Sequence, residues 1–382
     1  MFFIILYTII GLYLAVQIWQ LLALYRYQVY QNPEFNPLIF DTQNNYHSLP
    51  PISILVACRN EEKNIINCLK ALYRLNYPKE KVQILIGNDQ STDNTPKLVS
   101  DFIEEHRSEL FPNYLKMIDI QDGISDLKAK ARVMAQLDIQ ATGEYYLITD
   151  ADVQVNPNWA LGLLASLSNE MGVASGTTMV KSAGFSGRMQ EIDWTYFMGL
   201  LNLISFSGIP ATAVGNNMIV KKSAYWETGG YGKIQFSITE DYKLYSEICN
   251  KGWGWNNVMN EHVLAFSEKI DGFIPLLHQR KRWLSGGKEL PWYWWILFGV
   301  YALFYYMIPI LLVFQWKMGL LFWILKFCIQ TFQINRIYSL IKQDKHNIIS
   351  HFFYEIYMFC VTIGTSIFFL LPAKTIWKGR KY

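Results

Sequence analysis

The stretch ISILVACRNEE, residues 52–62, predicts the fold of this chain. Its apolar, largely β-branched first part predicts a buried strand at 52–58, and the segment from Glu61 to Leu75 predicts a helix after it. The same alternation recurs, with predicted strands VQILIGND (82–89), KMIDI (116–120) and YYLITDAD (145–152) and predicted helices at 96–109 and 129–141. Strands that alternate with helices in this way predict an α/β domain whose sheet is mostly parallel.

Apolar segments flank this domain, which we place at residues 48–290. The stretch from Phe2 to Tyr25 carries no charge and is about long enough to cross a bilayer, so residues 1–26 are predicted to form a transmembrane helix. A signal peptide would need a basic start and a small-residue cleavage site, and neither is present. Because Arg26 is the first charge, the positive-inside rule places the N-terminus outside and the α/β domain in the cytoplasm, and with the C-terminal apolar stretches this predicts a multi-pass cell-membrane protein.

The C-terminal part, residues 291–373, contains apolar stretches at 292–316, 318–338 and 352–372. The first and last are predicted spans. The middle stretch is either interfacial or packed against its neighbours, because its polar residues would be costly facing lipid; they are Lys326, Gln330, Gln333, Asn335 and Arg336. Two spans return the basic tail, residues 374–382, to the cytoplasm, but they leave Lys342 and Lys345 outside. The topology therefore stays open.

Composition limits the function classes. The five cysteines are scattered without a CxxC pair, which argues against disulfides and structural zinc; they are Cys58, Cys68, Cys249, Cys328 and Cys360. The net charge of +3 comes without a basic tract in the α/β domain, so we expect no nucleic-acid partner.

Polar residues follow the carboxyl ends of three predicted strands, at Arg59 to Glu61, at Asn88-Asp89 and at Asp150 to Asp152. Open parallel sheets bind nucleotides at this edge. Two further motifs lie downstream, TED at 239–241 and QRKRW at 279–283. Carboxylates hold a divalent cation on phosphate oxygens, and a guanidinium neutralises a leaving phosphate, so the set indicates a diphosphate site. The alternative is that residues such as Asn60 and Asp93 only cap the next helices.

The chain resembles the family 2 glycosyltransferases, which are inverting enzymes of the GT-A fold that use nucleotide-diphosphate sugars. The resemblance covers roughly residues 50–290 and rests on motifs in the family's order: ACRNEE (57–62), NDQSTDNT (88–95), LKAKA (127–131), TDAD (149–152), TED (239–241) and QRKRW (279–283). It implies a GT-A domain with transmembrane helices at both ends.

The resemblance also implies a donor pocket for a UDP-sugar. Asp89 and the backbone near Ala57 would contact the uracil and ribose, and Lys130, Arg59 and Glu61 would line the same pocket. Asp150 and Asp152 are similar to the family's DxD pair, with Asp152 the expected ligand of Mg²⁺ or Mn²⁺ and Asp150 closer to the ribose and sugar. In this sequence, Asn88 and Gln90 depart from the family's usual acid and glycine.

The matching general base is Asp241, which begins the helical segment YKLYSEICNKG and whose ionised form the helix dipole favours. The alternative is a helix cap formed by Thr239 and Asp241. Gln279, Arg282 and Trp283 resemble the QxxRW motif, in which the Arg binds the diphosphate and the Trp packs under the acceptor. Arg280 and Lys281 are expected to anchor the chain at the membrane instead.

Three features bear on the acceptor. The stretch 186–206 predicts a buried helix or, alternatively, an interfacial helix that presents a lipid. VGNNMIV (214–220) resembles the family's acceptor-side strand, which makes Gly215, Asn216 and Asn217 candidate acceptor contacts. WKGRKY (377–382) resembles the end of bacterial carotenoid and hopanoid glycosylating enzymes and, more distantly, of ceramide glucosyltransferases.

The leading prediction is therefore a hexosyltransferase that moves a sugar from a UDP-sugar to a membrane lipid. The first alternative is a processive synthase of the cellulose or hyaluronan type, whose polymer channel uses more helices. The second is an inactive nucleotide-sugar-binding membrane protein, which would be expected to lack one of the carboxylates or the Arg, and none is missing.

Overall fold

The computed structural model describes residues 2–30, 49–107, 114–122, 127–182, 184–372, 376–377 and 380–381. Lys374 and Lys378 of the predicted basic tail lie outside these ranges. Its contacts divide the chain into a sheet unit, Pro33–Met179 with Ile204–Glu268, and a helical unit, Met1–Asn32 with Val180–Leu203 and Lys269–Tyr382. The packing thus groups 180–203 and 269–290 with the terminal helices, although the sequence places them inside one domain at 48–290.

The sheet unit is built on a seven-stranded sheet in the order β3-β2-β1-β4-β8-β6-β9. The strands are β1 (Ile52–Cys58), β2 (Val82–Asn88), β3 (Leu115–Asp119), β4 (Tyr145–Asp150), β6 (Met171–Ser175), β8 (Asn217–Lys221) and β9 (Gly254–Asn257). The first four are mutually parallel and confirm the four predicted strands. Strand β8 runs antiparallel to both of its neighbours, so the sheet is mixed.

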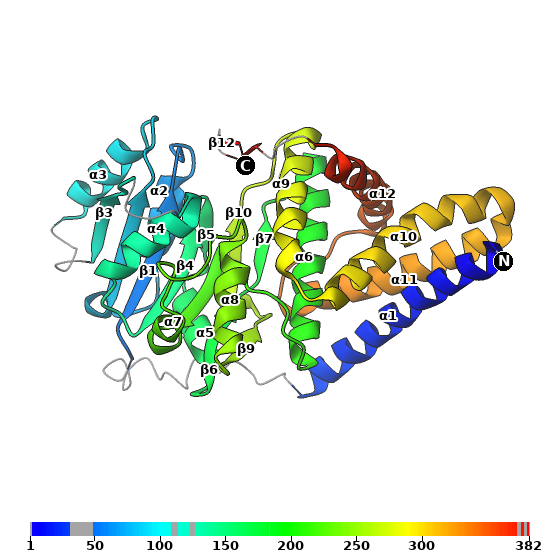
Figure 1. The fold of residues 1–382 in the computed structure, drawn as a ribbon, viewed down its shortest axis with the longest axis horizontal. Coiled ribbons are helices and arrows are strands. Elements are labelled where there is room, and N and C mark those ends of the chain that lie inside the picture. Colours follow the sequence, from blue (N-terminus) through cyan, green and yellow to red (C-terminus); the bar gives the residue numbers. More distant parts are fainter. Residues whose placement is uncertain are drawn as a thin grey trace. The chain divides into compact units, whose positions relative to one another are not determined.

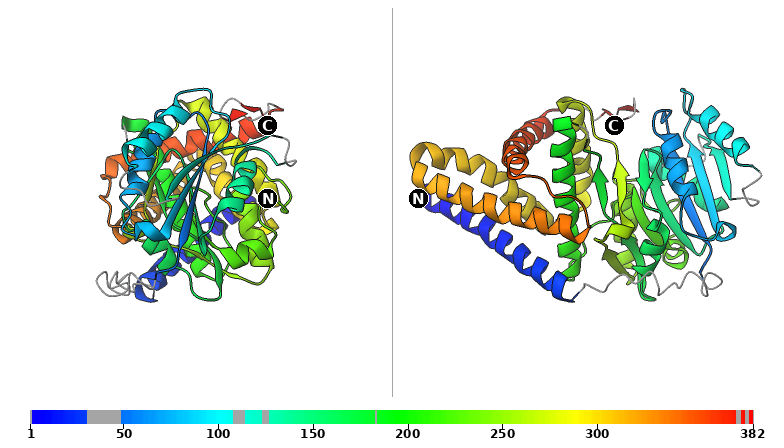
Figure 2. Two further views of the ribbon diagram at one scale, coloured as in Figure 1. Left: turned by 90° about the vertical axis from the view of Figure 1, so that its left-hand side faces the viewer. Right: turned by 180° about the vertical axis from the view of Figure 1, so that it is seen from behind.

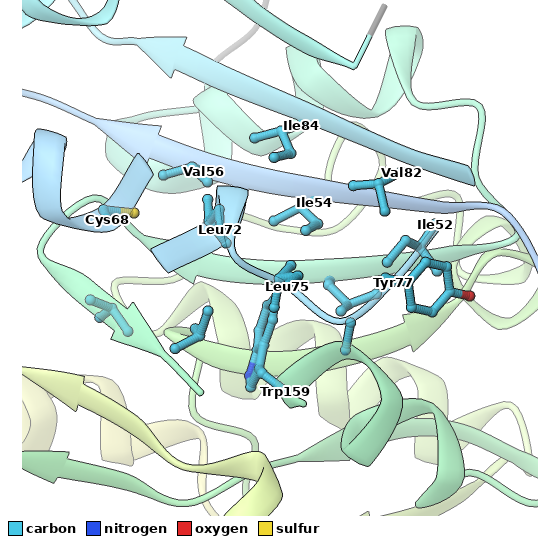
Figure 3. Close-up of a cluster of buried hydrophobic side chains, with 14 of the residues drawn as sticks. Ile52, Ile54, Val56, Cys68, Leu72, Leu75, Tyr77, Val82, Ile84 and Trp159 are labelled. Carbon is cyan, nitrogen blue, oxygen red and sulfur yellow. The ribbon is translucent and has the colours of Figure 1, made fainter. Parts of the chain in front are cut away.

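Helices cover this sheet because each crossover segment has one apolar face. They are α2 (Ile65–Tyr73), α3 (Thr95–Glu105), α4 (Ala129–Leu137), α5 (Trp159–Ala165), α7 (Lys222–Glu227) and α8 (Glu240–Asn250). Figure 3 shows the core between β1, β2 and α2, where Ile54, Val56 and Leu72 are almost completely buried and Trp159 packs nearby. A small sheet of β5 (Val153–Val155), β10 (Ala265–Ser267) and β7 (Thr178–Val180) completes the unit.

The helical unit contains α1 (Phe2–Tyr30), most of α6 (Gly184–Phe206), α9 (Phe273–Gly286), α10 (Trp292–Phe314), α11 (Trp316–Leu340) and α12 (Ile348–Leu370), with a short ribbon of β11 (Ile376–Trp377) and β12 (Arg380–Lys381). Helices α1, α10 and α11 pack against one another (Figures 1 and 2). Leu6, Ile10 and Tyr13 of α1 share an apolar core with Phe304 and Leu311 of α10.

Three helices in the described part of the chain are long and apolar enough to cross a membrane: Phe3–Val29, Trp292–Phe314 and Ile348–Leu370. They match the predicted N-terminal span and the first and last of the predicted C-terminal spans. Helix α11 is as long as these but too polar to meet the same criteria. The stretch 186–206 is helical, and most of its side chains are buried, as the prediction of a buried helix expects.

Candidate active site

The polar strand ends meet at one edge of the sheet. Ala57 lies between Gly87 on β2 and Asp150 on β4 in the parallel register, and Asp89 follows directly after β2. The predicted donor residues Ala57, Asp89 and Asp150 are therefore brought together, as the parallel order of β2, β1 and β4 requires.

Asp89 is almost fully buried and is held by two arginines. The Arg59 guanidinium donates to the Asp89 carbonyl oxygen at 2.6 Å and lies 3.8 Å from its carboxylate. Arg132 of α4 forms an ion pair with the same carboxylate and a second one with Asp122. Sequence analysis missed Arg132, because it lies just after the LKAKA motif, of which only Lys130 was assigned to the donor pocket. A buried arginine in a helix also has no distinctive spacing.

Two loops are joined above these strand ends. Asn60 has a left-handed φ of 51° and accepts a hydrogen bond from the Thr92 backbone N–H at 2.8 Å. Gln90 has a φ of 58°, which is a conformation that glycine adopts more easily. The residue that replaces the family's expected glycine therefore keeps a glycine-like backbone. Asn60 links the loops, whereas Asp93 does accept from the Thr95 backbone N–H at 3.0 Å, as a helix cap would.

Glu61 is buried beside this junction. Its backbone N–H donates to the Thr95 hydroxyl at 2.8 Å, and its carboxylate accepts from the Asn64 side chain at 2.9 Å. This places Glu61 under the loop as a support. Its predicted place in the donor pocket remains a prediction.

Lys130 connects the donor edge to the segment before β8. Its ammonium donates to the Asp150 carboxylate at 2.5 Å and to the Gly215 carbonyl at 2.7 Å, and Glu240 lies 3.9 Å away. Burial alone would lower the pKa of Lys130, but attraction to Asp150 and then to Glu240 outweighs it and raises that pKa. The ammonium is therefore a fixed positive charge in the site.

Asp241 lies in the first turn of α8 and faces the same glycine. One carboxylate oxygen accepts from the Gly215 backbone N–H at 2.8 Å and the other from the Tyr242 backbone N–H at 2.8 Å. A Cβ atom on Gly215 would approach the Asp241 Cβ to 2.8 Å. Gly215 is thus in contact with Lys130 on its carbonyl side and with Asp241 on its amide side, and the two backbone donors fix the orientation of the Asp241 carboxylate.

The two predicted acceptor asparagines differ sharply. Asn216 is half-buried, and its side-chain oxygen accepts from the Thr178 hydroxyl at 2.9 Å. Asn217 is completely buried. Its amide donates to the Thr177 and Val263 carbonyls at 3.0 and 2.9 Å and accepts from the Trp159 indole at 2.8 Å. The structure does not bring the Asn217 side chain to the site, because its amide is bonded to the buried backbone carbonyls of Thr177 and Val263.

Asp152 lies half-buried, two residues beyond Asp150. Among the described residues, no three His, Cys, Asp or Glu side chains gather as a metal cluster. Two carboxylates nevertheless suit a hard cation such as Mg²⁺, which takes most of its oxygen ligands from phosphates and water. Asp150 contacts the Lys130 ammonium, and the assignment of Asp152 as the cation ligand remains a prediction.

Gln279, Arg282 and Trp283 belong to α9, in the helical unit. Their spacing places them on one face of the helix, and all three are half-buried. Trp283 packs on Trp194 of α6, with ring centroids 4.9 Å apart.

The expected membrane anchors Arg280 and Lys281 have other partners. Arg280 forms an ion pair with Asp193 and lies over the Trp283 ring at 4.8 Å. Lys281 is buried and donates to the Phe368 and Leu371 carbonyls of α12 at 3.1 and 2.5 Å. Both charges have partners within the protein, and the expectation that Arg280 and Lys281 anchor the chain at the membrane remains a prediction.

Comparison with known proteins identifies the family. A model described as glycosyl transferase family group 2 matches residues 145–371, more than half of the chain, and a model of glycosyl transferase family 2 matches residues 53–229. The chain is a family 2 glycosyltransferase. This confirms the resemblance carried by the sequence motifs and the predicted enzyme class.

Two curated relatives of this glycosyltransferase have different activities. Poly-β-1,6-N-acetyl-D-glucosamine synthase of Staphylococcus epidermidis is 24% identical over 71% of the chain and 62% of the relative. β-Monoglucosyldiacylglycerol synthase of Nostoc is 28% identical over 63% of the chain and 50% of the relative. The chain thus spans between half and two thirds of the length of these relatives.

A solved structure supports the fold. The mannosyltransferase PcManGT from Pyrobaculum calidifontis, in complex with GDP-Man and Mn²⁺, superposes with a TM-score of 0.57 at 15% identity, over 96% of this chain and 99% of that one. The α/β architecture with terminal helices is therefore that of a known glycosyltransferase.

Proposed function

We propose that this family 2 glycosyltransferase moves a hexosyl group from a UDP-sugar to a membrane lipid with inversion at the anomeric carbon. The observation that carries the chemistry is the arrangement around Gly215. A fixed ammonium on Lys130 and a carboxylate on Asp241 lie on the two sides of one peptide segment, next to the strand end that carries Asp150. The Lys130 ammonium can thus attract a diphosphate, and the Asp241 carboxylate next to the same peptide segment can accept a proton from a hydroxyl.

In the proposed reaction, the acceptor hydroxyl oxygen forms a bond to the anomeric carbon while the bond from that carbon to the diphosphate oxygen breaks. Asp241 accepts the hydroxyl proton, and the electron pair of the broken bond leaves with UDP. Attack from the face opposite the leaving group inverts the anomeric configuration. The backbone N–H groups of Gly215 and Tyr242 orient the carboxylate for this role.

Donor recognition is proposed for the other end of the site. Asp89 would contact the base and ribose, and its two arginine partners fix its orientation. Arg59, Glu61 and the Ala57 backbone complete the proposed pocket. Asp152, with Asp150 beside it, would hold Mg²⁺ or Mn²⁺, which when bound supplies positive charge to the diphosphate. The Mn²⁺ that accompanies GDP-Man in PcManGT supports this choice.

Arg282 is proposed to neutralise the leaving diphosphate, with Gln279 on the same helical face and Trp283 under the acceptor sugar or lipid. The ion pair of Arg280 with Asp193 and the bonds of Lys281 to α12 hold α9 in place in the helical unit. The catalytic role of Arg282 is proposed because its position matches the arginine of the QxxRW motif.

A lipid acceptor is favoured over a growing polymer by the small number of candidate spans, three in the described residues, and by the similarity to a glucosyldiacylglycerol synthase. A polysaccharide synthase remains the second candidate function because the staphylococcal relative makes a polymer.

The test incubates membranes containing the protein with radiolabelled UDP-glucose, UDP-galactose or UDP-N-acetylglucosamine and Mn²⁺. Label is then partitioned between an organic extract and high-mass aqueous material, with Asp241→Asn membranes as the control. We expect control-sensitive label in the organic phase. Label in high-mass material would replace the lipid transferase with a polymer synthase, and label insensitive to Asp241→Asn would refute the proposed base.

A further inference from the structure

Helices α6 and α9 do not cross the membrane, because the chain gives neither of them a route to the side opposite the catalytic sheet. Helix α6 starts a few residues after β7 ends at Val180, and the chain returns to the sheet at β8 soon after α6 ends at Phe206. Helix α9 has 14 residues, about 21 Å at 1.5 Å per residue, which is shorter than a bilayer core. It also carries three consecutive basic residues.

Helix α12 is attached to these two helices near both of its ends. Near its start, the Phe353 ring packs edge-on against Phe185 in the first turn of α6, with centroids 5.5 Å apart. Near its end, Lys281 of α9 donates to the carbonyls of Phe368 and Leu371. Between them, Gly364 packs on Phe273 at the start of α9. A helix that crossed the bilayer would carry one of these ends to the far side.

Helices α1, α10 and α11 run together in a different direction. In Figure 1, α1, α10 and α11 rise from left to right, whereas α12 descends from left to right, so α12 crosses the direction of these three helices. Gln315 is the single residue between α10 and α11, and it accepts a hydrogen bond from Tyr7 near the start of α1. The three helices thus share one far end.

Three polar residues of α11, namely Lys326, Gln330 and Gln333, are compatible with crossing because they are buried against protein. Lys326 is completely buried, and its ammonium donates to both Glu355 oxygens at 2.5 Å and to the Tyr305 hydroxyl at 2.9 Å. Gln333 is also buried and accepts from Tyr196 at 2.7 Å. Beyond the first turn, the large exposed side chains of α11 are apolar, namely Leu320, Leu321, Ile324, Leu325 and Phe332. Paired charges inside a bundle are the arrangement that a membrane tolerates.

We infer that α1, α10 and α11 cross the membrane and that α12 lies in its plane, within the leaflet on the catalytic side, where lipid covers its exposed face. That face is an apolar stripe at helical spacing: Ile349, Phe352, Phe353, Ile356, Phe359 and Ile367. The opposite face turns Ser350, Tyr354 and Glu355 into the protein. Length and composition alone give the opposite result, because by these criteria α12 is a candidate span and α11 is not.

The charges agree with this arrangement. Since α11 returns the chain to the catalytic side, Lys342 and Lys345 between α11 and α12 lie on the same side as Arg26. This satisfies the positive-inside rule. If α12 were a span, either these two lysines or the basic tail would lie outside. Lysines beside an apolar in-plane helix also suit anionic headgroups, which makes lipid the occupant of the stripe. The inference does not depend on which acceptor the enzyme uses.

The test measures sidedness with single added cysteines at Lys97→Cys in the sheet unit, Lys317→Cys after α10, Lys345→Cys before α12, and one cysteine added after Tyr382. Sealed membranes are treated with an impermeant maleimide before and after permeabilisation, and the parent chain gives the blank. We expect Lys97, Lys345 and the C-terminal position to react from one side and Lys317 from the other. A C-terminal cysteine on the side opposite Lys345 would overturn the in-plane assignment, and Lys317 on the side of Lys345 would overturn the crossing of α11.

A second measurement identifies the occupant. A photoreactive benzoylphenylalanine is placed at Ile349, Ile356 or Ile367, with Lys97 as the control position on exposed α3. We expect lipid adducts at the three α12 positions and none at Lys97. Crosslinked dimers without lipid adducts would show that a second copy covers the stripe and would refute the lipid contact.

Discussion

The sheet unit and the helical unit each contain a lysine in contact with a carboxylate at 2.5 Å, yet the surroundings of the two pairs differ. The side chains of Lys130 and Asp150 are 11% and 34% exposed, whereas those of Lys326 and Glu355 are 0% and 5% exposed. Water or a ligand can replace Lys130 as the partner of Asp150. Nothing can replace Lys326 without opening the bundle, so the same chemical pair serves a reaction in one unit and the packing of helices in the other.

The largest expected effect concerns the open site. Asp241→Asn removes the proposed base but keeps a side chain of the same shape. We expect transfer to fall by about 10²–10⁴-fold, the usual contribution of general base catalysis. Donor affinity, measured by titration with the UDP-sugar, should change little because Asp241 is not in the proposed donor pocket. An equal loss of affinity would contradict this division of roles.

Lys326→Met tests the sealed pair by leaving the Glu355 charge buried without its partner. We expect the free energy of unfolding to fall by about 3–5 kcal/mol. The double variant Lys326→Met with Glu355→Leu should recover most of it, because both charges are then gone. Thermal unfolding in detergent compares the stability of the parent, the single variant and the double variant.

Lys130→Met is the matched change in the open pair. Asp150 remains partly solvated, so we expect a stability loss of only about 1 kcal/mol, together with a strong loss of transfer. If Lys130→Met destabilises the protein as much as Lys326→Met does, the contrast between the two pairs is wrong.

Asp152→Ala addresses the metal. We expect donor affinity in Mn²⁺ to fall by about tenfold, the loss of roughly one charged ligand contact of 1.5 kcal/mol. Removing the metal with EDTA should abolish the difference between the variant and the parent. Asp101→Ala, on the exposed face of α3, is the control carboxylate. Equal affinities of Asp152→Ala and the parent in Mn²⁺ would argue against ligation by Asp152.

The smallest expected effect is that of Gly215→Ala. The new Cβ would meet the Asp241 Cβ at 2.8 Å, so the carboxylate must shift. We expect the turnover rate to fall several-fold, on the scale of a misplaced catalytic group. Gly232→Ala is the matched control, because a Cβ there meets no atom within 4 Å. Equal rates of the two variants would mean that Gly215 does not position Asp241.

The parallel half of the sheet could be predicted from sequence, because each buried strand is a continuous apolar run followed by polar residues at its end. The antiparallel strand β8 could not, since strand direction depends on partners far apart in sequence, such as Tyr145 and Lys221. The sheet unit contains four motif residues at their predicted places. Asp89 and Asp150 lie at strand ends, and Lys130 and Asp241 lie at helix starts. Arg132 and the structural role of Asn217 depend on long-range contacts that no local pattern contains.

The membrane segments show the same limit. Hydropathy separates α11 from the candidate spans because it counts Lys326 as a charge, whereas packing shows that Glu355 neutralises it. Hydropathy likewise accepts α12, because it cannot detect that both ends of this helix are attached to α6 and α9.

The bonds from Lys281 to the end of α12 have a practical consequence for preparing the protein. A shortened chain ending near residue 290 would keep the QRKRW helix but remove the Phe368 and Leu371 carbonyls, leaving the Lys281 ammonium without these acceptors. It would also uncover Phe273 and Leu277 where Gly364 packs. Such a fragment would expose an apolar surface on the helix that carries Arg282, so crystallisation and kinetics require the intact chain in detergent or nanodiscs.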